Sequence, residues 1–186
     1  MIENSLNASN EILKNLAFLD TETTGLNPYD KSIIELSIIS FDKELVRNEK
    51  TYNFEFDELK ADKKALEVNR YHERKASWSN AKRFKASASE IGDLLFKKTL
   101  VAHNAFFDTL FLTQEFKRTG RGYMPWRRVI DTYSISRFLF GEEANNSLDG
   151  LRKRFSLSTE GNHTSLKDTE DLLLIYLEMS KLIKGN

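Results

Sequence analysis

Residues 16–22, with the sequence LAFLDTE, are the most informative segment for predicting the fold of this chain. Its apolar run ends directly at Asp20, a pattern typical of a short buried strand that finishes in polar residues. Side chains two positions apart on a strand point to the same side, so the carboxylates of Asp20 and Glu22 are expected side by side. The stretch therefore predicts a strand with paired acids at its end, although a strand end that turns into solvent would carry such a pair as well.

The segments that follow predict a mixed sheet with helices on its faces. Residues 33–41 are rich in isoleucine, which indicates a second strand. Over residues 51–56, aromatic residues alternate with polar ones, which indicates a third strand after a turn over 42–48. The three segments together predict an antiparallel meander of three strands. Apolar spacing then predicts helices over 87–96, 104–118, 132–140 and 164–183 and short strands over 99–102 and 129–131. We therefore predict an α/β fold in which three antiparallel strands are followed by parallel strands. This arrangement resembles the ribonuclease H-like architecture.

Composition fits one folded domain. The 186 residues include 40% hydrophobic residues and no cysteine, which excludes a disordered chain, disulfides and thiolate metal sites. The longest apolar run, residues 172–177, is far too short to span a membrane, and residues 1–10 lack the pattern of a secretory signal. We expect a single domain over residues 1–186 with a core over about residues 15–183, a flexible N-terminus over residues 1–12 and a cytoplasmic location.

Charge is balanced, with 28 Lys+Arg against 28 Asp+Glu. A net charge of zero argues against an extended grip on nucleic acid but allows a local contact. The basic residues of the second half gather in two places, namely Lys117, Arg118, Arg121, Arg127 and Arg128, and then Arg152, Lys153 and Arg154. Each group is either a solvated surface or a face for phosphates.

Two further acids stand in apolar surroundings. Asp108 shares its predicted helical face with Phe111 and Leu112, and Asp168 begins the apolar face formed by Leu172, Ile175, Tyr176 and Met179. A buried carboxylate is unfavourable unless a cation or hydrogen bonds compensate it. Asp108 would otherwise be a hydrogen-bonded structural residue, and Asp168 an acid that complements the dipole at a helix N-terminus.

Together, Asp20, Glu22, Asp108 and Asp168 indicate a shared cation site. Oxygen ligands favour Mg²⁺ or Mn²⁺, and four carboxylates would hold two ions about 4 Å apart, the arrangement for displacement at phosphorus. His163, five residues before Asp168, would serve as the general base for an attacking water, with an exposed loop histidine as the alternative.

The order of these motifs resembles that of the DEDDh 3′–5′ exonucleases. Residues 20–26 match the Asp-x-Glu motif, residues 103–108 match the Asn-containing helix start that ends in Phe-Asp, and His163 with Asp168 matches His-x₄-Asp. The resemblance covers roughly residues 15–180. Within the family, the chain resembles the proofreading (epsilon-type) subunits of bacterial DNA polymerase III.

The resemblance implies a role for each matching residue. Asp20, Glu22, Asp108 and Asp168 would be the metal ligands for two Mg²⁺ ions, which Mn²⁺ would replace, and His163 the general base. The substrate would be bound by Thr23, Leu26, His103, Asn104 and Phe107. The implied reaction is stepwise hydrolysis of single-stranded DNA from its 3′ end to nucleoside 5′-monophosphates, with a DNA polymerase as a partner.

Two features depart from the proofreading subunits. Residues 65–72 replace the Gly-Ile-Thr-like segment that helps to hold the terminal nucleotide, with residues 69–72 as the substitute. The chain ends at Asn186, directly after the last predicted helix, and its one glutamine is Gln114, which favours a stand-alone exonuclease or a different docking surface. The alternatives are an exoribonuclease with the same chemistry and a non-catalytic module that binds nucleic acid or a polymerase.

Overall fold

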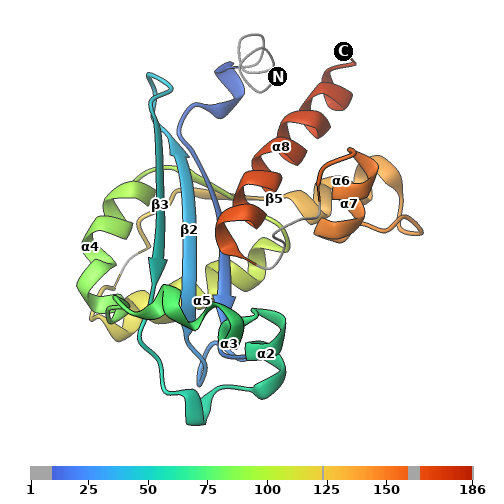
Figure 1. The fold of residues 1–186 in the computed structure, drawn as a ribbon. Coiled ribbons are helices and arrows are strands. Elements are labelled where there is room, and N and C mark those ends of the chain that lie inside the picture. Colours follow the sequence, from blue (N-terminus) through green and yellow to red (C-terminus); the bar gives the residue numbers. More distant parts are fainter. Residues whose placement is uncertain (1–9, 123, 159–163, 186) are drawn as a thin grey trace.

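The computed structural model describes residues 10–122, 124–158 and 164–185. At its centre is a five-stranded sheet in the order β3-β2-β1-β4-β5 (Figure 1). The strands are β1 (Leu16–Thr23), β2 (Ile33–Phe41), β3 (Arg47–Asn53), β4 (Thr99–Ala102) and β5 (Arg128–Asp131). β1, β2 and β3 pair antiparallel, whereas β4 runs parallel to β1 and β5 parallel to β4. This confirms the predicted mixed sheet.

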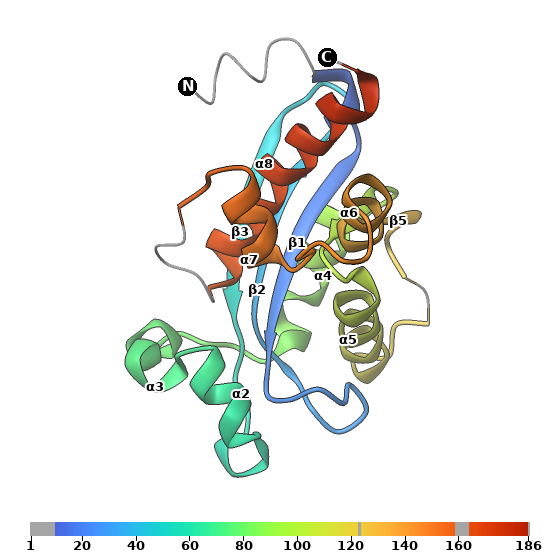
Figure 2. The same ribbon diagram turned by 90° about the vertical axis from the view of Figure 1, so that its right-hand side faces the viewer.

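Helices cover both faces of the sheet (Figure 2). The α-helices are α2 (Lys63–Val68), α3 (Tyr71–Arg74), α4 (Phe84–Leu95), α5 (Ala105–Arg118), α6 (Thr132–Phe140), α7 (Leu148–Arg154) and α8 (Ser165–Lys184), and the 3-10 helices are η1 (Asn10–Leu13), η2 (Glu58–Lys60) and η3 (Lys75–Trp78). α8 packs on one face of β1 and β2, with α6 and α7 beside it, whereas α4 and α5 pack on the other face. Within the described ranges, no helix is long and apolar enough to cross a membrane.

Alternation along β1 divides its side chains between two cores. Ala17 and Leu19 belong to the core shared with α4 and α5, and Leu16 and Phe18 to the core shared with α8. Asp20 and Glu22 continue the second series, because side chains two apart lie on the same side of a strand. The apolar half of β1 therefore fixes the strand between two cores and directs its two acids toward α8.

β3 begins earlier than the sequence pattern predicts. It spans Arg47–Asn53 rather than residues 51–56, and its register with β2 runs from Phe41↔Arg47 to Glu35↔Asn53. Because residues 47–51 form an exposed edge strand, they carry no apolar alternation that would mark the strand. Phe54 leaves the ladder, and its side chain is buried in the core beneath α4.

Candidate active site

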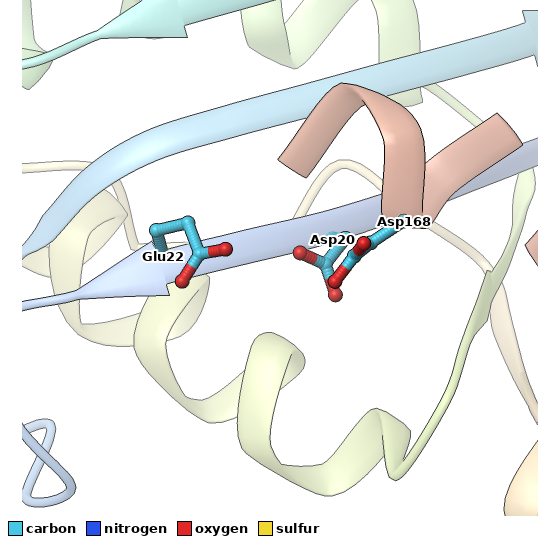
Figure 3. A group of neighbouring side chains, drawn as sticks. All are labelled: Asp20, Glu22 and Asp168. Carbon is cyan, nitrogen blue, oxygen red and sulfur yellow. The ribbon is translucent and has the colours of Figure 1, made fainter. Parts of the chain in front are cut away.

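Three carboxylates from β1 and α8 meet at one end of the sheet (Figure 3). Each of Asp20, Glu22 and Asp168 offers an oxygen, and these oxygens all lie within 4.8 Å of one another. Asp168 lies in the first turn of α8, a helix capped by the Thr164 hydroxyl, which accepts a hydrogen bond from the amide of Lys167. The strand and the helix thus bring together acids that are almost 150 positions apart in the sequence.

Asp108 approaches β1 from the opposite side. Its Oδ1 accepts hydrogen bonds from the backbone N–H of Thr21 (3.1 Å) and from the Thr21 hydroxyl (2.8 Å). Thr21 alternates with Asp20 and Glu22, so it points toward α5, the helix that carries Asp108. This approach is open because β4 pairs with β1 only as far as Phe18. The structure therefore groups three of the four predicted acids and leaves Asp108 buried next to them.

Burial, followed by repulsion from neighbouring acids, raises the pKa values of Asp20 and Glu22, and burial raises that of Asp108. Burial raises the pKa of Asp20 well above its usual value, and the charges of Asp108, Glu22 and Asp168 raise it further. The pKa of Glu22 is raised to about 8, first by burial and then by the charges of Asp168 and Glu35. Burial raises the pKa of Asp108 to about 7 against the lowering effect of the hydrogen bonds from Thr21.

The residues present fit a divalent cation. Carboxylates that raise one another's pKa lack sufficient positive charge around them, and a bound cation would relieve both repulsion and desolvation. The donor set consists of oxygens alone, which is the set that Mg²⁺ and Mn²⁺ prefer. We therefore regard Asp20, Glu22 and Asp168 as the residues that would hold such an ion.

Stability of the metal-free protein should decrease as the pH rises. The pKa of Glu22 is about 8 in the folded protein against an ordinary 4.5, and that of Asp108 is about 7 against 3.8. Between the ordinary and the raised pKa of each group, the folded protein therefore binds more protons than the unfolded chain. By linkage, the free energy of unfolding falls across this range, by about 2 kcal/mol or more, and a divalent cation should restore it at high pH. Thermal unfolding in EDTA and in Mg²⁺, at about pH 5 and about pH 8, measures the effect. A larger Mg²⁺ stabilisation at the lower pH would contradict it.

Glu35, which the sequence analysis did not single out, supports the site from β2. It lies directly opposite Glu22 in the β1–β2 register. Its Oε1 accepts hydrogen bonds from the backbone N–H (2.8 Å) and hydroxyl (2.9 Å) of Ser165, and its Oε2 contacts Arg74 at 2.5 Å. Glu35 thereby ties the start of α8 to the sheet and fixes the turn that carries Asp168. An acid within the isoleucine-rich strand 33–41 was the signal that could have revealed it.

Arg152, the first residue of the basic group at 152–154, is held inside the fold and does not face solvent, where a phosphate would bind. Arg152 is 1% exposed, and its guanidinium contacts Asp168, Asp171 and Asp149 at 2.6, 2.7 and 2.6 Å. Arg154 packs over the Phe140 ring. Local sequence does not predict this burial, because Arg152 is followed by two exposed basic residues and its acidic partners are 3, 16 and 19 positions away.

Arg118, from the other basic group, also serves the fold. Its guanidinium donates hydrogen bonds to the backbone carbonyls of Pro28 (2.8 Å), Tyr29 (3.1 Å) and Lys31 (3.0 Å) and pairs with Glu115 at 2.8 Å. These contacts fasten the loop that follows β1. The loop is closed on the other side by the amide of Thr24, which donates to the Ser32 carbonyl.

A cavity of about 340 Å³ opens beside the carboxylates. It is lined by Thr21, Glu22, Thr23, Gly25, Leu26, Asp62, Lys64, Ala65, Val68, Asn69 and Phe107. Three of the predicted substrate contacts, Thr23, Leu26 and Phe107, thus line one cavity. Asn69 is buried and donates a hydrogen bond to the Thr23 carbonyl (2.8 Å), so the segment after β3 does contribute to this wall.

His103 and Asn104 are not part of that lining. His103 Nδ1 lies 3.0 Å from the Thr132 hydroxyl, and burial lowers the pKa of the ring. Asn104 adopts a left-handed backbone conformation before α5 (φ 64°), and its backbone N–H donates a hydrogen bond to Asp131 Oδ1. Both residues shape the connection between β4 and α5. His163, the predicted general base, lies outside the described residues, which resume at Thr164.

Two known proteins of similar sequence carry the name DNA polymerase III. The chain is 31% identical over 169 residues to DNA polymerase III subunit epsilon of Rickettsia prowazekii, covering 87% of this chain and 72% of the relative. It is 29% identical over 167 residues to DNA polymerase III PolC-type of Staphylococcus haemolyticus, covering 89% of this chain but only 11% of that much longer protein.

Solved structures with the same fold are exonucleases. E. coli exonuclease I in complex with a dT13 oligonucleotide has a TM-score of 0.72 at 17% identity, over 92% of this chain and 41% of that one. Exonuclease X in complex with 5′ overhanging duplex DNA has a TM-score of 0.64 at 20% identity, over 92% and 93% of the two chains. At such identities the likeness establishes the ribonuclease H-like fold. A sequence model of the exonuclease family matches residues 17–176. The chain therefore belongs to the exonuclease family, which confirms the resemblance noted in the sequence and the predicted enzyme class, a 3′–5′ exonuclease.

Proposed function

We propose that this exonuclease removes nucleotides one at a time from the 3′ end of single-stranded DNA, with two Mg²⁺ ions and with His163 as the general base. One observation carries the proposal: Glu22 belongs both to the carboxylate cluster and to the wall of the cavity. A terminal nucleotide held in that cavity would place its phosphodiester bond at the cluster.

In this proposal the carboxylates would bind the cations and His163 would transfer the proton. Asp20, Glu22 and Asp168, with Asp108 beside them, would hold the ions. The chemistry that such ions supply is polarisation of the scissile phosphate and activation of a water molecule. His163 would accept the proton of the attacking water, because an imidazole titrates close to neutral pH.

The cavity favours a single unpaired nucleotide. Its volume of about 340 Å³ is at the small end of ligand sites, which supports the proposal that it holds one nucleotide. Leu26 and Phe107 give it apolar walls suited to a base, and Phe107 is held by Phe111, with ring centroids 4.8 Å apart. These features support our proposal that the substrate end is single-stranded when it enters.

Replacing Leu26 with alanine should raise KM and leave kcat nearly unchanged. Leu26 is 82% exposed in the free protein, so the change removes apolar contact with the base without disturbing the core. Loss of this contact should cost about 1–2 kcal/mol, which is roughly a tenfold rise in KM. Leu59→Ala is the matched control, because Leu59 is 96% exposed and does not line the cavity. Equal kinetics for Leu26→Ala and Leu59→Ala would remove Leu26 from the binding site.

The similar proteins support a role in DNA replication or repair. Two relatives carry the names DNA polymerase III subunit epsilon and DNA polymerase III PolC-type, and one structural neighbour was solved with a dT13 oligonucleotide. We extend these likenesses to a DNA substrate, to a DNA polymerase as a partner and to the bacterial cytoplasm as the location.

A labelled-oligonucleotide assay tests the proposal. Single-stranded DNA and RNA of one sequence, labelled at the 5′ end, are incubated separately with the protein in Mg²⁺, in Mn²⁺ and in EDTA. We expect a ladder of progressively shorter DNA products in either metal, none in EDTA, and slower shortening of RNA. Faster shortening of RNA would identify an exoribonuclease, and oligonucleotide binding with no product in any metal would identify a non-catalytic module.

A further inference from the structure

Arg152 is a fully buried guanidinium that links three carboxylates. It heads the group of largest buried side chains, at 1% exposure. Nη1 contacts Asp149 on its own helix, whereas Nε and Nη2 contact Asp171 and Asp168 on α8. All three distances lie between 2.6 and 2.7 Å, so the planar guanidinium is held in one orientation.

A purely architectural role would not require the contact with Asp168. The pair with Asp171, which is 1% exposed, already joins α7 to α8, and Lys167 gives Asp171 a second cation at 2.5 Å. The third contact instead reaches Asp168 Oδ1, within the group of carboxylates that would hold the cation. Arg152 also lies near enough to Asp20 for its charge to act on that carboxyl group.

We propose that Arg152 is a positioning residue for the cation site, one that fixes the orientation of Asp168 and offsets one negative charge of the cluster. The proposal rests on the function proposed above. The hydrogen bond to Oδ1 restrains the orientation of the Asp168 carboxylate. The positive charge meanwhile lowers the attraction of the cluster for that cation.

These two contributions can be separated by substitution. Lysine keeps the positive charge but cannot make three directed contacts, because its ammonium group lacks the planar fork of arginine. Glutamine loses the charge and most of the contacts. Geometry should therefore govern the turnover rate in both variants, whereas charge should govern cation affinity in the glutamine variant alone.

The experiment measures Mn²⁺ binding by titration calorimetry and, separately, the single-turnover rate on a DNA oligonucleotide in saturating Mn²⁺. For Arg152→Lys we expect an almost unchanged Kd for Mn²⁺ and a rate lower by about 10–100-fold. For Arg152→Gln we expect a comparable loss of rate together with Mn²⁺ binding that is at least about tenfold tighter, since removal of one positive charge strengthens the attraction of the cluster. Arg154→Gln, on the exposed side of the same helix, is the matched control and should change neither quantity.

A role limited to structure would move both quantities in the same direction. Weaker Mn²⁺ binding by Arg152→Gln, or a parental rate for Arg152→Lys, would overturn the proposal. Arg152→Gln leaves the buried carboxylate of Asp171 with one partner fewer, and the double variant Arg152→Gln/Asp171→Asn removes that charge. This double variant should also bind Mn²⁺ more tightly than the single variant Asp171→Asn. If the parent protein itself neither binds Mn²⁺ nor shortens DNA, the proposed function fails, and that outcome is distinct from the failure of the role of Arg152.

Discussion

The Asp20→Asn variant is expected to release nucleotides from single-stranded DNA at least about 10³-fold more slowly than the parent, because the Lewis-acid stabilisation lost with a ligand is worth several kcal/mol. Asp20 lies in the cluster with Glu22 and Asp168, and the charges of Asp108, Glu22 and Asp168 add to burial in raising its pKa. Asparagine preserves the shape of the side chain and retains one carbonyl oxygen. It removes the negative charge that a divalent cation requires.

The loss of activity should not come from unfolding. The pKa of Asp20 is raised by burial and by three neighbouring acids, so its ionised form opposes folding in the absence of a cation. Asp20→Asn should therefore be at least as stable as the parent in EDTA near neutral pH, and Mg²⁺ should stabilise it less. Thermal unfolding with and without Mg²⁺, beside a product ladder, measures both effects.

Asp93→Asn is the matched control for charge. Asp93 is exposed on α4, the helix on the opposite face of the sheet from α8, and the same substitution there should leave the rate and the Mg²⁺ stabilisation unchanged. If Asp20→Asn forms product at a rate within a few-fold of that of Asp93→Asn, Asp20 is not a cation ligand.

Replacing His163 with alanine should lower the rate by about 10²–10⁴-fold, the usual size of a general-base contribution. His163 directly precedes Thr164, the N-cap of the helix that carries Asp168. The start of that helix is fastened to the sheet by the Ser165–Glu35 hydrogen bonds. The residue after His163 therefore lies one helical turn before Asp168, whose backbone N–H donates a hydrogen bond to the Thr164 carbonyl (3.0 Å).

The His163 variant should differ from the Asp20 variant in one respect. Because His163 is assigned no cation, Mn²⁺ binding should persist in His163→Ala while the rate falls, and the rate should lose the part of its pH dependence that reflects imidazole titration. His72→Ala, at an exposed histidine of α3, is the matched control. An unchanged rate would exclude His163 from the mechanism, and loss of Mn²⁺ binding would assign it to the cation site instead.

Much of the fold could be predicted from apolar patterning. The buried strands β1 and β2 and the helices α5 and α8 agree with their expected positions to within a few residues, because each buries a continuous apolar face. β3 was placed too late, since its exposed first half carries no such pattern. α7 had no prediction at all, because its charged residues conceal the few apolar ones.

The candidate site was only partly predictable. Period-2 geometry places Asp20 and Glu22 side by side, but it is the further acids in apolar surroundings, Asp108 and Asp168, that indicate a shared site. Glu35 and Arg152 did not follow, because their partners are far away in the sequence. A charged residue that is buried and paired across the fold is the same residue type as one exposed to water, so composition cannot distinguish the two.

The amino-acid sequence is enough to predict the α/β sheet, the candidate acids and the family, because these depend on local periodicity and on the order of motifs. The packing of the fold is needed to see which carboxylates lie together, that Asp108 accepts hydrogen bonds from Thr21 on the other side of β1, and that Arg152 and Arg118 are held within the fold. The reason is that proximity and burial depend on how the strands and helices pack, and both Coulomb attraction and desolvation depend on distance and surroundings rather than on sequence separation.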